Sequence, residues 1–136
     1  MIARGHRVDI YEPANNWSLG NLRREHGDQP LSAFRNAYPH LESSFYDPAT
    51  LDLDQALADA DLVIVHEWND AHFIRRIGEH RRSNGSYRLL FHDTHHRAIS
   101  DSDTIGDYHL LDYDGVLAFG RVIRDLYLEQ EWAQRA

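Results

Sequence analysis

Five ionisable side chains lie within six consecutive positions of this 136-residue chain, and no other segment is better suited to chemistry. They are His92, Asp93, His95, His96 and Arg97, and they directly follow the apolar run 89–91. Imidazoles exchange protons near neutral pH, and carboxylates orient or assist them. Because the carboxyl ends of strands in a parallel α/β sheet border the ligand crevice, this pattern predicts a ligand site.

A second cluster has the same design. His66, Glu67 and Trp68 follow the apolar run 62–65, so two strand ends should contribute to a single site. Trp68 has two possible roles, as a platform against which a sugar ring stacks or as a side chain packed over the end of the sheet. Asn69 or Asp70 is expected to cap the helix that follows.

The histidine cluster admits three interpretations. Imidazole and carboxylate are ligands of zinc or iron, but the spacing matches no standard metal motif, and the chain has no cysteine. A His-Asp pair can also satisfy the backbone of a loop without any further role. We favour the third interpretation, a site for a non-metal ligand, with a metal-dependent hydrolase as a minor alternative.

A glycine after the last predicted strand suggests a further contact. Gly120 would let the backbone approach a ligand, and Arg121 begins a helix whose amino end favours an anion. The acidic pairs Asp52/Asp54 and Asp101/Asp103 are better explained as solvated helix caps than as catalytic carboxylates.

Composition limits the possible functions. The formal net charge of -8 argues against binding to a nucleic-acid backbone. No apolar run reaches the roughly 18 residues of a membrane span, and the first residues do not resemble a signal peptide. The absence of cysteine is compatible with the cytoplasm, which is the expected location.

The order of elements predicts an α/β fold, a Rossmann-like parallel sheet with helices on both faces. Strands are expected at 8–12, 44–46, 62–65, 87–91 and 115–119, and helices at 19–26, 31–38, 52–59, 71–82 and 122–134. Asn16 is a candidate cap of the first helix, which Gly27 and Pro30 are expected to end. The apolar stripe of the fourth helix is Phe73, Ile74 and Ile77, and the candidate core residues of the last helix are Val122, Ile123, Leu126, Tyr127 and Trp132. The unbroken apolar run 62–65 is typical of a strand buried on both faces. Segment 1–4 with Gly5 resembles the end of a helix, so the first, central strand of the sheet is expected to be missing. Its neighbours would then pair directly or leave a gap.

Several segments, in this order, resemble the amino-terminal domain of GT-B glycosyltransferases, closest to the family-4-like and spore-maturation-protein-like groups. They are Arg4-Gly5-His6-Arg7-Val8, Val65-His66-Glu67-Trp68-Asn69, Phe91-His92-Asp93-Thr94-His95-His96 and Tyr113-Asp114-Gly115-Val116-Leu117-Ala118-Phe119-Gly120. The resemblance covers nearly the whole chain. It implies a single domain over 1–136, incomplete at both ends, that binds the sugar acceptor.

The resemblance also implies roles. A carboxy-terminal domain outside this chain would hold a nucleotide-sugar donor, and no metal cofactor would be required. The catalytic residues would be His92, near the reacting sugar, and Asp93, orienting the imidazole or its loop. Acceptor contacts would come from His66, Glu67 and Trp68, with further substrate contacts from His95, His96 and Arg97. Gly120 and Arg121 would face the donor phosphates. The alternative is a non-catalytic α/β binding module or an inactive fragment.

Overall fold

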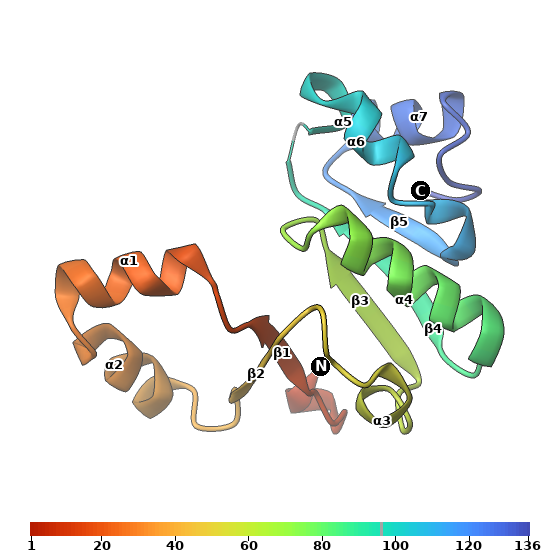
Figure 1. Cartoon of the computed structure of the whole chain (residues 1–136). Coiled ribbons are helices and arrows are strands. Elements are labelled where there is room, and N and C mark those ends of the chain that lie inside the picture. Colours follow the sequence, from red (N-terminus) through yellow and green to blue (C-terminus); the bar gives the residue numbers. More distant parts are fainter. Residues whose placement is uncertain (96) are drawn as a thin grey trace. The chain divides into compact units, whose positions relative to one another are not determined.

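The computed structural model describes residues 1–95 and 97–136 and divides the chain into two compact units, Met1–Leu51 and Asp52–Ala136 (Figure 1). Each unit contains its own parallel sheet. The predicted α/β class with parallel strands is therefore confirmed. Whether the chain is one domain stays a prediction.

The first unit is a strand-helix-helix-strand arrangement. A 3-10 turn, Ile2–Arg4, ends at Gly5, which has the positive φ of 82° expected of a C-terminal cap. Strand β1 (Ile10–Pro13) pairs in parallel with β2 (Ser43–Tyr46), and helices α1 (Trp17–His26) and α2 (Gln29–Ala37) connect them. The Asn16 side chain caps α1 by accepting the backbone N–H groups of Ser18 and Leu19.

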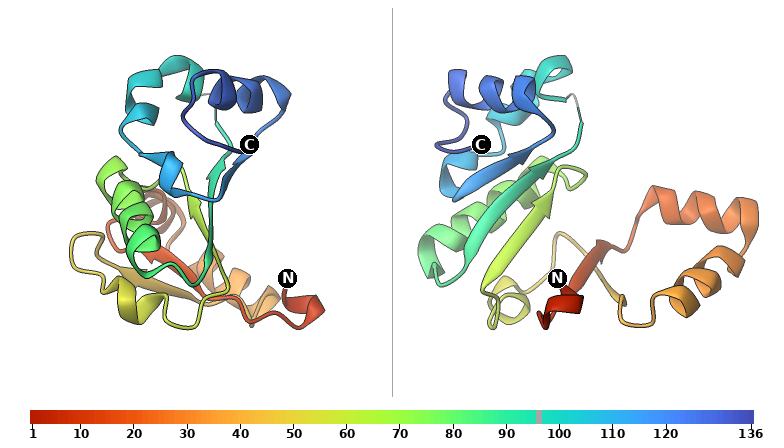
Figure 2. Two further views of the ribbon diagram at one scale, coloured as in Figure 1. Left: turned by 90° about the vertical axis from the view of Figure 1, so that its right-hand side faces the viewer. Right: turned by 180° about the vertical axis from the view of Figure 1, so that it is seen from behind.

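The second unit contains the larger sheet. Strands β3 (Leu62–His66), β4 (Arg88–Asp93) and β5 (Gly115–Ala118) are parallel, with β4 in the middle (Figures 1 and 2). Helix α3 (Leu53–Ala56) precedes β3, and α4 (Ala71–Asn84) connects β3 to β4. Short helices α5 (Arg97–Ser100), α6 (Ser102–Gly106) and η2 (Leu110–Asp112) lead to β5, and α7 (Arg121–Glu129) follows it.

One face of this sheet forms the core. Val65, Leu89, Phe91 and Val116 alternate onto that face and are buried. Phe73, Ile74 and Ile77 of α4 are buried as well, which confirms the predicted apolar stripe of that helix. The opposite face is different, because Leu62 and Ile64 are 41% and 45% exposed and Leu117 is also exposed. The prediction that run 62–65 is buried on both faces is wrong.

Each sheet has its own strand order. Among the described residues, β1 pairs with β2 alone and β3 with β4 alone. β1 is thus an edge of one sheet and β3 an edge of the other. Whether the neighbours of the expected missing strand pair directly or leave a gap stays a prediction.

Several element boundaries differ from the predictions. The first strand covers 10–13 instead of 8–12, and the acidic helix expected at 52–59 is a single turn, Leu53–Ala56. The first helix ends at His26, before Gly27 and Pro30, as expected, and Pro30 itself lies in the first turn of α2, where its missing N–H has no intrahelical partner to lose. The last helix ends at Glu129, and its predicted core residue Val122 is exposed, whereas Ile123 and Tyr127 are buried.

Candidate functional site

The two polar clusters meet at the carboxyl ends of β3 and β4, as the sequence predicts. His66 is the register partner of His92, and the two imidazoles are 5.1 Å apart in an edge-to-face arrangement. Glu67 and Asp93 each follow one residue later and therefore belong to the opposite face of the sheet. The imidazoles lie on the partly exposed face, and the carboxyl groups lie on the buried face.

The Glu67 carboxyl ties the two strand ends together. Glu67 is only 1% exposed, and its Oε1 atom accepts the Thr94 hydroxyl at 2.9 Å and the Thr94 backbone N–H at 3.1 Å. Burial raises the pKa of Glu67 above its ordinary value, and the adjacent Asp93 carboxyl raises it further. A buried, hydrogen-bonded carboxyl in this position holds the loop after β4 in place. It does not line an open surface, which differs from the expected acceptor contact.

The hydrogen bonds of His66 define its neutral form. Its Nδ1 atom lies 3.3 Å from the Trp68 backbone nitrogen, and because an N–H group can only donate, Nδ1 is the acceptor. The proton of the neutral ring is then on Nε2, which lies 3.4 Å from the Thr94 hydroxyl oxygen. Partial burial and the nearby His92 lower the pKa of His66. His66 therefore acts as a neutral hydrogen-bond donor at neutral pH.

Asp93 orients its loop. Its Oδ1 accepts the His95 backbone N–H at 2.9 Å, and its Oδ2 accepts the hydroxyl of the buried Tyr127, also at 2.9 Å. Of the two roles expected for Asp93, alignment of the loop and alignment of the His92 imidazole, the hydrogen bonds match the first. Among the described residues, the His92 side chain has a ring contact with His66 and no hydrogen bond. Its nitrogen atoms are therefore open to a ligand.

Trp68 does not pack over the end of the sheet. The residue is 66% exposed, with its ring nearly parallel to that of His66 and in edge contact with His95 at 5.6 Å. The Arg97 guanidinium lies 5.7 Å from the centre of the indole. Arg97 also donates to the Tyr108 hydroxyl at 3.0 Å, and this bond raises the pKa of Arg97. The indole is thus a supported, solvent-facing aromatic surface beside two imidazoles.

The other predicted site residues are placed differently. Gly120, with a φ of 93°, precedes α7, and Arg121 is the first residue of that helix. Among the described residues, neither makes a hydrogen bond or ion pair with the histidine cluster. His96 lies outside the described residues. Asp70, as predicted, caps α4 by accepting the Phe73 N–H at 2.8 Å.

Sequence reasoning missed the role of two hydroxyl groups. Thr94 stands inside the polar cluster, but its bonds to Glu67 and His66 depend on how the strands align. Tyr127 is expected only as a core residue, and its bond to Asp93 joins positions 34 residues apart. Tyr127 lies among apolar residues of α7, and these do not indicate a polar partner for its hydroxyl.

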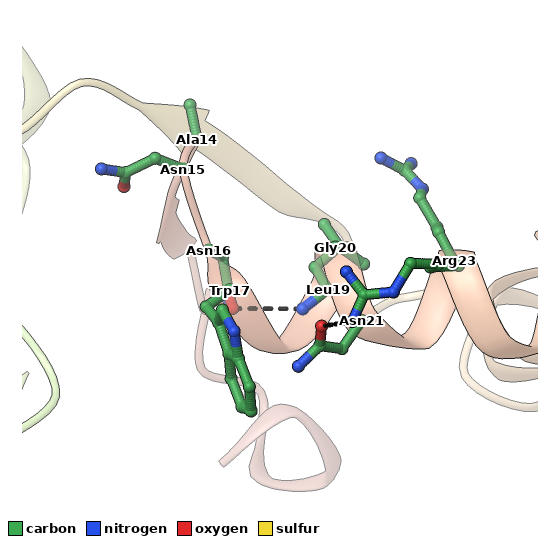
Figure 3. A pocket seen from close by; sticks show the side chains of 9 residues that line it. Ala14, Asn15, Asn16, Trp17, Leu19, Gly20, Asn21 and Arg23 are labelled. Atoms are coloured by element: carbon green, nitrogen blue, oxygen red, sulfur yellow. Dashed lines mark hydrogen bonds between the residues drawn. The ribbon is translucent and has the colours of Figure 1, made fainter.

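Two other features bear on function. Within residues 1–95 and 97–136, no group of three His, Asp or Glu side chains is arranged to hold a metal ion. A shallow hollow of about 370 Å³ lies at the start of α1, beside Trp17 (Figure 3). There the Asn16 side chain already accepts two backbone N–H groups of the helix start, and this leaves the end of the larger sheet as the stronger candidate.

No helix in the described parts of the chain has the length and apolar character needed to cross a membrane. Comparison with known proteins finds no matching family model, no matching curated protein and no matching solved structure.

Proposed function

We propose that this chain supplies the acceptor side of a cytoplasmic glycosyltransferase, which transfers a sugar from a nucleotide-sugar to an acceptor hydroxyl. The observation that carries the proposal is the exposed Trp68, whose ring stacks with that of His66, while the His66 imidazole lies 5.1 Å from that of His92 at the carboxyl ends of two parallel strands. Trp68 offers a face for the acceptor ring, and His92 a base for its hydroxyl.

The arrangement of the two histidines supports separate roles for them. His66 has both nitrogen atoms engaged by the protein, so its role is to hold Trp68 and Thr94 in place beside the ligand. His92 has no hydrogen bond from the described residues and can accept the hydroxyl proton as the new glycosidic bond forms. Asp93, held by Tyr127, keeps the loop that follows His92 in register.

The donor side lies with Gly120, Arg121 and a carboxy-terminal donor-binding domain in this proposal. Gly120 has a positive φ and no side chain, so a ligand can approach the backbone at the start of α7, where an anionic group is favoured. The reaction requires no metal in this scheme, because protein groups would stabilise the nucleoside phosphate that leaves as the sugar passes to the acceptor hydroxyl.

Carbohydrate binding is the direct test. The chain is titrated with methyl glycosides of glucose, mannose, galactose and N-acetylglucosamine, and the indole N–H signals are followed by NMR. We expect at least one glycoside to shift the Trp68 signal saturably, with a dissociation constant on the order of millimolar, as for a small neutral ligand. Trp68→Ala should abolish this binding.

Trp17→Ala is the matched control, because Trp17 is 77% exposed and belongs to the other unit. Binding that survives in Trp17→Ala and disappears in Trp68→Ala supports the acceptor site. If no glycoside shifts the Trp68 signal, or if Trp68→Ala binds as well as the original chain, the carbohydrate assignment is wrong.

A further inference from the structure

A second concave surface lies at the amino end of the larger sheet. It encloses about 400 Å³ and is lined by four arginines and two aspartates, together with uncharged residues. The arginines are Arg81, Arg82, Arg88 and Arg135, and the aspartates are Asp112 and Asp114. The histidine cluster is at the carboxyl end of the same strands, so the two sites are distinct.

Three protein groups donate hydrogen bonds to the Asp114 carboxylate. Its carboxylate accepts the Leu89 N–H at 2.8 Å, the Arg88 guanidinium at 2.9 Å and the Arg81 guanidinium at 3.4 Å. The Leu89 bond, followed by the Arg88 bond, lowers the pKa of Asp114. This carboxylate stays charged and fixes the start of β4 to the residue before β5.

Arg82 and Arg88 keep unused donor capacity. One nitrogen of Arg82 lies 3.3 Å from both oxygens of Asp112, and one nitrogen of Arg88 meets Asp114. A guanidinium carries five N–H groups. The side chains of Arg82 and Arg88 are 65% and 75% exposed, so their remaining N–H groups face solvent.

Arg135 is positioned by its backbone. Its carbonyl oxygen accepts the Val116 N–H at 2.9 Å, next to Gly115. A Cβ atom at Gly115 would lie 3.4 Å from that oxygen and 3.5 Å from the Arg135 Cβ, so the two segments pack at van der Waals distance. The Arg135 side chain forms no ion pair within the described residues.

The charges in this cavity do not balance. Four guanidinium groups face two carboxylates, in a chain whose formal net charge is -8. An ion-pair network that served only to join α4, β4 and β5 would need no surplus cation. The surplus is made of arginine, whose planar fork of donors matches a phosphate group in two-point contact.

We propose that this arginine cavity binds the phosphate groups of a small anionic ligand, with Arg135, Arg88 and Arg82 as the contacting cations. Three guanidinium groups offer more N–H donors than the oxygens of one phosphate group need, so a diphosphate should bind more tightly than a single phosphate. This site does not depend on the glycosyltransferase proposal, and it would exist whether or not the chain binds sugar.

Pyrophosphate and inorganic phosphate are the probes. Each is titrated into the full chain at constant ionic strength, and binding is followed by ¹H–¹⁵N NMR at the backbone of residues 112–116. We expect saturable shifts, with pyrophosphate bound more tightly than phosphate. Arg135→Gln should weaken pyrophosphate binding by about tenfold or more, the loss corresponding to one charge-assisted contact.

Arg75→Gln is the matched control. Arg75 lies in α4, as Arg81 and Arg82 do, but it pairs with Glu79 and does not line the cavity. The backbone contacts of Arg135 do not involve its guanidinium, so Arg135→Gln should fold, and its unchanged NMR dispersion will confirm this. Equal binding by Arg135→Gln and Arg75→Gln, or shifts that grow linearly without saturation, would overturn the proposal.

Discussion

The Tyr127–Asp93 hydrogen bond gives a sharp test of how the loop after β4 is held. Tyr127→Phe removes one oxygen atom and leaves the ring contact with Trp132, at 5.8 Å between centroids. Both partners of the lost bond are buried, and its donor and acceptor atoms are 2.9 Å apart. Water therefore cannot readily replace the hydroxyl.

The expected cost follows from the acceptor. A hydrogen bond to a charged group contributes about 1.5–3 kcal/mol, and a neutral one about 0.5–1.5 kcal/mol. Tyr113 provides the neutral comparison, since its hydroxyl donates to the Ile74 carbonyl at 2.7 Å and is also buried. Tyr127→Phe should then lower the free energy of unfolding by roughly 1 kcal/mol more than Tyr113→Phe.

Urea unfolding, followed by far-ultraviolet circular dichroism, measures both variants against the original chain. The slope of the unfolding free energy against urea should be unchanged, so that a shift in midpoint reports stability alone. If Tyr127→Phe costs no more than Tyr113→Phe, then Asp93 does not act as a buried charged acceptor. The explanation given for the loop would be refuted.

Three further perturbations test other contacts. Because the pKa of Glu67 is raised in the folded state, its stabilising contribution is complete below about pH 4.5, the ordinary carboxyl value, and is lost as the pH rises through the raised value. In the original chain the urea midpoint should therefore fall as the pH rises, and Glu67→Gln should remove this fall. If the midpoint of Glu67→Gln depends on pH as that of the original chain does, the raised pKa does not belong to Glu67. Asp70→Ala removes the cap of α4 and should lower the free energy of unfolding by about 1 kcal/mol in the same urea assay, whereas Asp70→Asn should keep most of the stability. Leu89→Ala, at a fully buried position of β4, should cost about 2–5 kcal/mol by thermal or urea unfolding, and a smaller loss would mean that the site collapses around the cavity.

Local sequence signals predict the local structure of the chain well. Asn16, Asp70 and Gly5 are expected at helix ends and are found there, because a cap depends on residues within one turn. The meeting of His66 with His92 is also predictable. It needs only that two parallel strands align at their carboxyl ends.

The sequence does not show directly which residues far apart in the chain come into contact or cover one another. The run 62–65 is apolar enough for a central strand, but its burial depends on which elements cover each face, and Ile64 remains partly exposed. In the same way, no residue near Glu67 in the sequence predicts that Thr94 will donate a hydrogen bond to the Glu67 carboxyl. Such contacts are fixed by how the strands align and by packing, and a single sequence shows neither directly.

The outer edge of β3 affects how the protein behaves in solution. Among the described residues of Asp52–Ala136, β3 pairs only with β4, so within this unit the other side of its backbone has no neighbouring strand, and Leu62 and Ile64 of the same strand are exposed. An edge of this kind is a template for strand addition between chains, and charged side chains are the usual means of blocking it. Replacing Ile64 with lysine would put a charge beside that edge, which makes this substitution a means of suppressing self-association in concentrated solution.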